Sequence, residues 1–217
     1  MRRKINLDFD LAPSIGHQVN AKLVGEYLKN GSRILDIGCW SGQLLRALKK
    51  EKSFFRYFGI DVINEVISYV KKAEPEANFK IASALRIPYK SSFFDVVTLF
   101  DVLEHIPKDT EVHCLKEIRR VIKDNGVLII STPADNIFSK IFDPAYFLLK
   151  HRHYSKSKLL VFLESCGFEV KIFKTTGLIF YGTYILLQLF FKHVFNSTYP
   201  NRGVFKYIEI KAAKELN

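Results

Sequence analysis

An aspartate and two glycines near the start of the chain have the types and spacing of a nucleotide site. A short apolar strand, predicted at 33–37, contains Asp36 and runs into a turn from Gly38 to Gly42. The helix predicted at 42–50 follows, so bare backbone N–H groups and the positive end of a helix meet at one point. This pattern favours a nucleotide-like ligand, although a tight turn in any α/β domain can produce it too.

A second carboxylate follows at a useful interval. The strand predicted at 54–60 ends at Asp61, 19 residues after Gly42, and Val62 comes next. A carboxylate at this strand tip can accept hydrogen bonds from both ribose hydroxyls of a nucleoside, and the interval suits a nucleotide-binding βαβ unit. A role for Asp61 as a helix N-cap is compatible with that interpretation.

The first strand and turn resemble the first motif of class I S-adenosylmethionine-dependent methyltransferases, Asp-x-Gly-x-Gly-x-Gly. Asp36, Gly38 and Gly42 match the motif, and Trp40 stands where the middle glycine is usual. The resemblance implies that S-adenosylmethionine is the cofactor. It also implies that Asp36 orders the amino-acid end of the cofactor and that Asp61 holds the ribose.

A longer stretch extends this resemblance. Residues 87–106 run from Ile-Pro through Phe-Asp-Val-Val to Glu-His, and they include a buried strand predicted at 94–100. This order is similar to small-molecule methyltransferases near the ubiquinone-biosynthesis O-methyltransferases. The strand predicted at 79–82 is followed by Ser83, Ala84 and Leu85, where the resemblance implies that the adenine is read. The cofactor-binding residues predicted in this way are Asp36, Gly38, Cys39, Gly42, Asp61, Val62, Ser83, Ala84, Leu85, Phe100 and Asp101.

Methyl transfer from a sulfonium is an in-line displacement, and a hydroxyl acceptor must also lose its proton to a base. His105 is the candidate catalytic base, because it lies just beyond the tip of the central strand. A histidine that only shapes the pocket is the alternative. His17, His151 and His153 are weaker candidates. We expect no metal, because the acidic residues show no carboxylate cluster suited to Mg²⁺.

The chain length of 217 residues suits one domain, 1–217. We expect an α/β, Rossmann-like, doubly wound sheet of seven strands, parallel except for an antiparallel last strand. Residues 1–30 form an N-terminal arm and helix. The remaining expected elements are helices at 17–29, 63–73 and 110–122, a turn at 124–126, strands at 127–131, 169–174 and 204–210, and a helix capped by Ser155.

An uncharged stretch of seventeen residues, 175–191, lies between the last two predicted strands. It is slightly short for a membrane-spanning helix, and one crossing would separate two strands of the same sheet. We therefore expect residues 178–202 to form an apolar insertion before the last strand. It would cap the substrate pocket as a lid, lie in an anionic membrane surface, or be buried in a homodimer contact.

The net charge of +11 is uneven along the chain, because residues 140–211 carry eleven Lys/Arg against four Asp/Glu. Such a bias suits an anionic partner, and a plain lysine-rich surface is the alternative. The three cysteines are an odd number and widely spaced, which suggests neither a disulfide frame nor a zinc site and fits the reducing cytosol. The first residues do not resemble a signal peptide.

The sequence therefore predicts a cytoplasmic methyltransferase, at most peripheral at the membrane, that acts on a small-molecule acceptor. We expect transfer to oxygen rather than nitrogen, with a lipid-linked or isoprenoid acceptor suggested by the apolar insertion and its basic flanks. One alternative is a non-catalytic cofactor-binding or membrane-surface protein, suggested by Trp40 and Ser83. Another is a nucleic-acid methyltransferase, suggested by charge alone, although nucleic acid is the partner that we least expect. A nicotinamide enzyme is disfavoured because the glycine pattern is broken.

Overall fold

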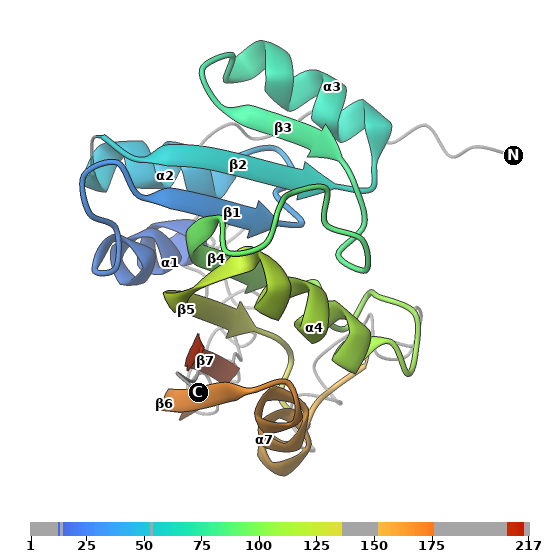
Figure 1. The fold of residues 1–217 in the computed structure, drawn as a ribbon. Helices are drawn as coiled ribbons and strands as arrows, with labels where there is room; N and C mark the ends of the chain where they lie inside the picture. Colours follow the sequence, from blue (N-terminus) through green and yellow to red (C-terminus); the bar gives the residue numbers. More distant parts are fainter. Residues whose placement is uncertain (1–12, 14, 53, 136–151, 176–207, 215–217) are drawn as a thin grey trace, which may run out of the picture.

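The computed structural model describes residues 13, 15–52, 54–135, 152–175 and 208–214 (Figure 1). A central sheet has the strand order β3-β2-β1-β4-β5-β7-β6. The strands are β1 (Arg33–Ile37), β2 (Arg56–Asp61), β3 (Asn78–Ile81), β4 (Phe94–Phe100), β5 (Ile122–Ser131), β6 (Phe168–Thr175) and β7 (Ile208–Lys214). The first five strands pair in parallel. This ordered parallel sheet confirms the Rossmann-like part of the predicted fold.

The backbone of β7 lies between β5 and β6 and runs antiparallel to both. The strand predicted at 204–210 shares only residues 208–210 with β7, and 204–207 lie outside the described residues. Within the described residues, β7 continues four residues beyond the predicted end at 210, because a short apolar run does not define its own ends.

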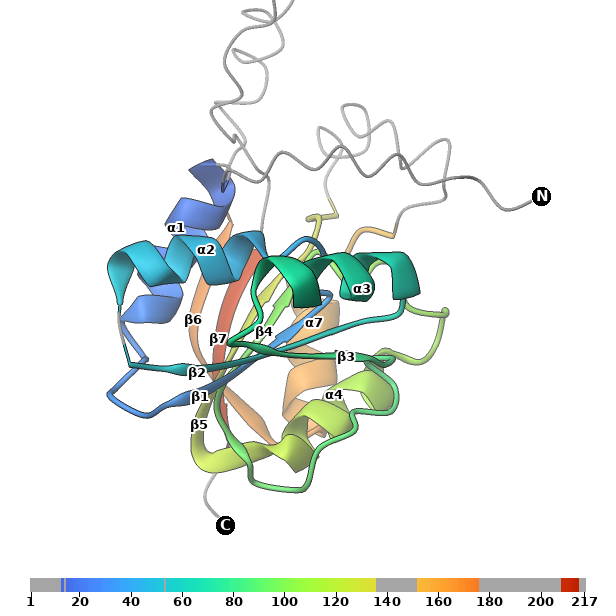
Figure 2. The same ribbon diagram turned by 90° about the horizontal axis from the view of Figure 1, so that it is seen from above.

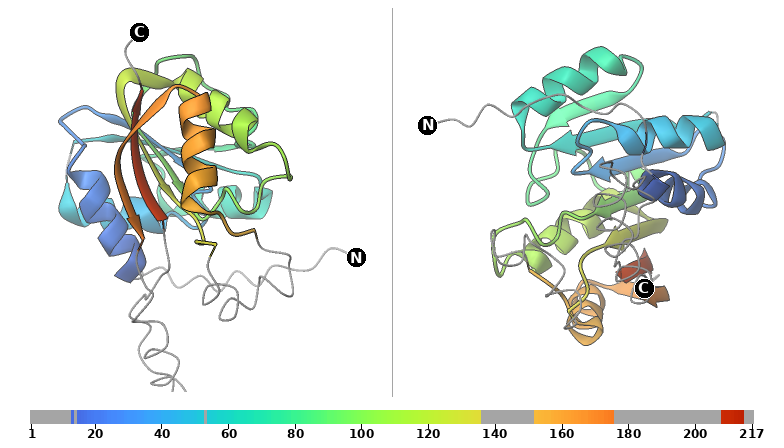
Figure 3. Two further views of the ribbon diagram at one scale, coloured as in Figure 1. Left: turned by 90° about the horizontal axis from the view of Figure 1, so that it is seen from below. Right: turned by 180° about the vertical axis from the view of Figure 1, so that it is seen from behind.

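Helices cover both faces of the sheet (Figures 2 and 3). On one face lie α1 (Ile15–Gly25), α2 (Gln43–Glu51) and α3 (Asn64–Ala73), and on the other lie α4 (Glu111–Val121) and α7 (Lys156–Ser165). Successive side chains of β1 point to opposite faces of the sheet, so Ile34 packs on the α1–α3 side and Leu35 on the α4–α7 side. The same alternation directs Asp36 toward the α1–α3 side.

Two predicted boundaries near the amino-terminal half were wrong. The helix expected at 17–29 ends at Gly25, and Glu26 N–H then donates to the Leu23 carbonyl in a tight turn. The strand expected from Phe54 begins at Arg56. Phe54 has φ +75° and its carbonyl accepts from Gly31 N–H at 2.7 Å, so this residue belongs to a turn.

The predicted turn at 124–126 was also wrong, because those residues lie within β5. The pairing of β4 with β5 shifts register between Phe94 and Val96, so extra β5 residues oppose β4 there. Gly126 allows this close approach, since a Cβ would lie 3.2 Å from the Asp95 carbonyl oxygen. The turn-forming residues 124–126 therefore belong to a bulge and not to a turn between two elements.

Several predictions fall wholly or partly outside the described residues: the arm at 1–12, His151 and the insertion at 178–202. Across the ranges that the structure does describe, no helix combines the length and the apolar character needed to cross a membrane. The predicted cap of α7 is confirmed, because the Ser155 hydroxyl accepts a hydrogen bond from Lys158 N–H at 3.3 Å.

Candidate functional site

A pocket opens at the carboxyl ends of β1 and β4. The chain order of the sheet reverses here, because β2 and β3 extend the sheet on one side of β1 and β4 on the other. Open α/β sheets bind ligands at this switch point. Helices α1 and α2 complete the pocket, which is lined by Gly16, His17, Asn20, Asp36, Gly38, Cys39, Trp40, Gln43, Leu44, Phe100 and Asp101.

The pocket brings together part of the predicted site. Five of the predicted cofactor residues line it, namely Asp36, Gly38, Cys39, Phe100 and Asp101. The other six do not line it, namely Gly42, Asp61, Val62, Ser83, Ala84 and Leu85, and neither does the predicted base His105. His17, a weaker histidine candidate, lies in the lining. Burial, and then the charge of Arg46, lower the pKa of His17, so this side chain is neutral near pH 7.

Asp36 is a buried carboxylate with two internal hydrogen-bond donors. The Thr98 hydroxyl donates to Oδ1 at 2.7 Å, and the Tyr57 hydroxyl donates to Oδ2. Thr98 is the register partner of Asp36 on β4, and Tyr57 comes from the neighbouring strand β2. Burial raises the pKa of Asp36 to about 6, although both hydrogen bonds oppose the rise. The sequence motif indicated Asp36 but not its partners, which depend on strand register.

Asp61 joins the tip of β2 to the loop 38–42. Its Oδ2 accepts from Trp40 N–H at 3.2 Å, and its Oδ1 accepts from Ile63 N–H at 3.0 Å. A carboxylate has about four acceptor positions, so both oxygens keep capacity for ligand hydroxyls. The N-cap of α3 is Ile63 and has no side-chain cap, so the predicted N-cap role of Asp61 was wrong. The contact with Ile63 N–H leaves room for a ribose-binding role. Val62 beside it is exposed.

The two motif glycines are required by the packing of the protein itself. Gly38 has φ +75°, and a Cβ there would lie 2.3 Å from Val102 Cγ2. Gly42 has φ +78°, and a Cβ there would lie 2.8 Å from Val70 Cγ2. Trp40 between them adopts φ +41° with a half-exposed side chain, so the loop turns without a third glycine.

The segment 101–106 leads from the pocket to the predicted base. Asp101 has φ +55°, and its carboxylate accepts from the Ser131 hydroxyl at 3.2 Å. The His105 side chain is exposed, and its backbone N–H donates to the Val102 carbonyl at 2.9 Å. The structure thus places His105 on the loop that leaves the pocket, outside its lining.

A buried glutamate supports the same segment and was missed from the sequence. Glu104 Oε2 accepts from the Thr132 hydroxyl at 3.0 Å, while Oε1 has no hydrogen-bond partner among the described residues. Burial, and then the charge of Asp101, raise the pKa of Glu104 to about 8. The Glu-His pair was recognised as a motif, but nothing local indicates that the glutamate is buried.

Two side chains from the 152–155 segment fasten this loop. The Arg152 guanidinium donates to the carbonyls of Leu103, at 2.9 Å, and Ile106. The Tyr154 hydroxyl donates to the same Leu103 carbonyl at 3.0 Å. Sequence reasoning singled out the surrounding histidines and missed both anchors, because the contacts join segments about 50 residues apart.

The predicted adenine-reading residues form a turn after β3. The Ser83 hydroxyl accepts from Leu85 N–H at 3.1 Å, Ala84 is buried, and the Leu85 carbonyl lies 2.9 Å from His113 Nε2. This turn lies two strands from β1, at the same edge of the sheet. Asn20 and Gln43 were also missed, since no local signal marks a polar helix residue that faces a pocket.

Residues 35–130 match the family model described as a methyltransferase domain. The chain is 27% identical over 144 residues to a probable S-adenosylmethionine-dependent methyltransferase of Mycolicibacterium smegmatis, covering 65% of this chain and 53% of that protein. It is 26% identical over 114 residues to the ubiquinone/menaquinone biosynthesis C-methyltransferase UbiE of Campylobacter jejuni, covering 50% and 48%. The chain thus spans about half the length of these curated relatives.

Solved structures show the same fold. A SAM-dependent methyltransferase from Methanosarcina mazei superimposes with a TM-score of 0.69 at 22% identity, covering 90% of this chain and 98% of that one. Similarity at this identity establishes the architecture, and the chemistry has to be argued from the site.

Proposed function

We propose that this chain transfers a methyl group from S-adenosylmethionine to a small-molecule acceptor. The proposal is supported by the match of residues 35–130 to a methyltransferase domain and by similarity to a probable S-adenosylmethionine-dependent methyltransferase. The observation that carries the proposal is the pocket at the switch point between β1 and β4. Asp36, Gly38 and Asp101 converge there, and Asp61 is joined to the same loop.

The residues present fit the cofactor. Asp61 retains acceptor capacity for two ribose hydroxyls, and Asp36 supplies a carboxylate for the ammonium of the amino-acid end. Cys39, Phe100 and Asp101 line the same space, with Gly42, Val62 and the turn 83–85 at the neighbouring strand ends. The assignment of the adenine to Ser83, Ala84 and Leu85 rests on the family resemblance.

S-adenosylmethionine supplies a methyl group on a sulfonium sulfur, so this chain has mainly to hold an acceptor in line behind that methyl. For a hydroxyl acceptor we assign His105 as the base. When the acceptor oxygen displaces the sulfur from the methyl carbon, the carbon–sulfur bond would break with its electron pair left on a neutral thioether, and the hydroxyl proton would move to the imidazole of His105. The exposed position of His105 on the loop 101–106 suits contact with an acceptor arriving from solvent.

The finer parts of the proposal concern the acceptor and the remaining chain. A lipid-linked or isoprenoid acceptor is supported by the uncharged stretch 175–191 and by similarity to proteins named for quinone biosynthesis. One of these relatives is named a C-methyltransferase and another an O-methyltransferase, so transfer to oxygen rests on the resemblance of residues 87–106. We also propose one domain, 1–217, whose seven-stranded sheet ends in an antiparallel strand, with 178–202 as a lid. The alternatives to a lid are that this insertion contacts an anionic membrane surface or a homodimer partner.

The test is transfer of tritiated methyl from S-adenosylmethionine to a panel of isoprenoid phenols and catechols, with and without anionic vesicles. Labelled product is expected with wild type. His105→Gln should lower kcat about 100-fold while keeping the Kd for S-adenosylhomocysteine. Lys108→Gln, at an exposed position just beyond the loop 101–106, is the control. Binding without transfer to any acceptor would favour the non-catalytic alternative.

A further inference from the structure

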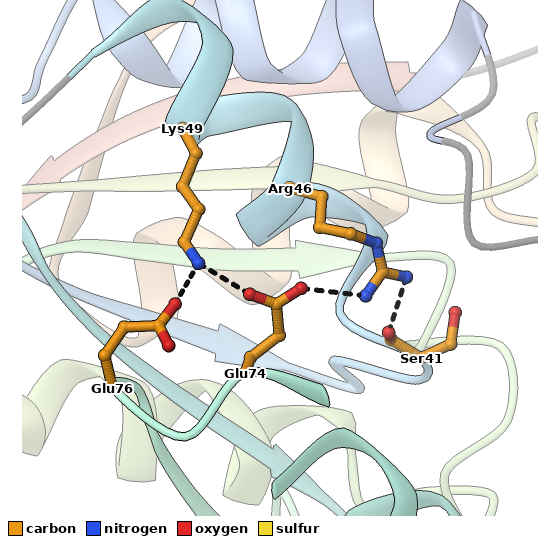
Figure 4. Close-up of polar contacts among 5 residues, drawn as sticks. All are labelled: Ser41, Arg46, Lys49, Glu74 and Glu76. Carbon is orange, nitrogen blue, oxygen red and sulfur yellow. Dashed lines mark hydrogen bonds and ion pairs between the residues drawn. The ribbon is translucent and has the colours of Figure 1, made fainter. Parts of the chain in front are cut away.

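An ion-pair network joins helices α2 and α3 beneath the loop 38–42 (Figure 4). The Arg46 guanidinium contacts the Glu74 carboxylate at 3.1 Å through one terminal nitrogen and the Ser41 carbonyl at 2.7 Å through the other. Lys49 contacts the second oxygen of Glu74 at 2.6 Å and also pairs with Glu76. The Arg46 guanidinium thus contacts both the end of α3, through Glu74, and the backbone of the loop 38–42, through Ser41.

Glu74 is buried, with only 9% of its side chain exposed, and it ends α3. A buried carboxylate is stable only when it is paired, because removal of one partner leaves an uncompensated charge in a poorly solvated place. Arg46 and Lys49 both supply that charge. Only Arg46, however, also reaches the loop, so the two cations differ in what they position.

The network also fills the space next to the second motif glycine. A Cβ on Gly42 would lie 3.6 Å from the Arg46 guanidinium and 3.9 Å from Glu74 Cγ, beyond the closer contact with Val70. Ser41 is fully buried, and its hydroxyl has no hydrogen-bond partner among the described residues. The carbonyl bond from Arg46 is therefore the side-chain contact that fixes Ser41 in this part of the structure.

We propose that Arg46 and Glu74 are positioning residues for the cofactor: the fork of Arg46, oriented by Glu74, sets the course of the loop 38–42 through the Ser41 carbonyl. This inference rests on the proposed function, because the loop lines the pocket assigned to S-adenosylmethionine. Planar, two-pronged geometry is the property that arginine has and lysine lacks. Lysine at position 46 can keep the charge next to Glu74 but cannot span both acceptors in the same way.

The experiment compares Arg46→Lys and Glu74→Gln with Lys49→Met, which removes an ion pair to the same carboxylate without touching the loop. Trp40 is the only tryptophan in the chain and lies within the loop, so its fluorescence reports loop geometry directly. The Kd for S-adenosylhomocysteine and the melting temperature are measured on each variant.

We expect Arg46→Lys and Glu74→Gln to move the Trp40 emission to longer wavelength and to raise the Kd about tenfold, the loss typical of one hydrogen bond to a charged group. Lys49→Met should lower the melting temperature and leave emission and Kd unchanged. An unchanged Kd in Arg46→Lys, or an equal rise in Lys49→Met, would overturn the inference. If wild type fails to bind the ligand, the proposed function fails, while the emission shifts still test whether Arg46 holds the loop.

Discussion

The Thr98 hydroxyl donates a hydrogen bond of 2.7 Å to Oδ1 of Asp36, across the two strands between which the sheet order reverses. Tyr57 donates to the other oxygen from β2. Asp36 thus lies at the junction of three parallel strands, in the lining of the pocket. Its protonation state should therefore govern how well the pocket holds an ammonium group.

The affinity for S-adenosylmethionine should weaken as the pH falls through about 6, where Asp36 becomes neutral. The Tyr57 hydrogen bond favours the charged carboxylate, so Tyr57→Phe should raise the pKa of Asp36 and move the midpoint of the affinity profile to higher pH. Calorimetric Kd values from pH 5 to 8 check this expectation. A midpoint at or below the wild-type value in Tyr57→Phe would contradict it.

Glu104 should make the stability of the protein depend on pH with an unusual sign. Burial raises its pKa to about 8 from an ordinary 4.5. The folded state therefore binds a proton more tightly than the unfolded state, and this contribution to stability is lost as pH rises through about 8. We expect the melting temperature of Glu104→Gln, relative to wild type, to increase between pH 5 and pH 9.

The control for that series is Glu164→Gln, which removes an exposed glutamate on α7. It corrects for the general effect of deleting a carboxylate. The groups that interact with Glu104 include Asp101, Thr132, Arg152 and Tyr154, and none of them is altered. A relative melting temperature of Glu104→Gln that stays level or falls with rising pH would show that Glu104 is ionised in the folded protein.

Gly38→Ala should destabilise the protein by about 2 kcal/mol, because a positive φ and a clash with Val102 act together. Adding Val102→Ala relieves the clash and leaves the φ penalty, so the double variant should recover about half of the loss. Urea unfolding of the two single variants and the double variant measures this coupling. Strictly additive losses would refute a direct contact between residues 38 and 102.

Much of the fold followed from local sequence, and the exceptions have physical causes. Amphipathic spacing predicted α3 and α4 to within a residue of their ends, because one helix face packs against the sheet. The bulge at 124–126 was predicted as a turn, because Asp, Asn and Gly are common both in turns between elements and in bulges within a strand. A tight turn at Phe54 depends on a carbonyl contact with Gly31, which no local pattern reveals.

The site was predictable where it consists of strand tips. Asp36 and Asp101 could be expected at one edge because the carboxyl ends of parallel strands coincide there. The supporting contacts were not predictable. Arg46 with Glu74, and Arg152 with the loop 101–106, are separated by 28 and by 46 or more residues, and their pairing depends on how whole helices pack.

The measurement that tests the central claim most directly is a calorimetric titration of wild type, Asp61→Ala and Asp95→Ala with S-adenosylmethionine and with NADH. Asp95 also accepts a backbone N–H, from Arg33 at 2.8 Å, but near the amino-terminal starts of β1 and β4, so it is the matched control. The account predicts binding of S-adenosylmethionine alone, weakened at least tenfold by Asp61→Ala and unchanged by Asp95→Ala. Absence of binding to wild type, or equal affinity in Asp61→Ala, would contradict it.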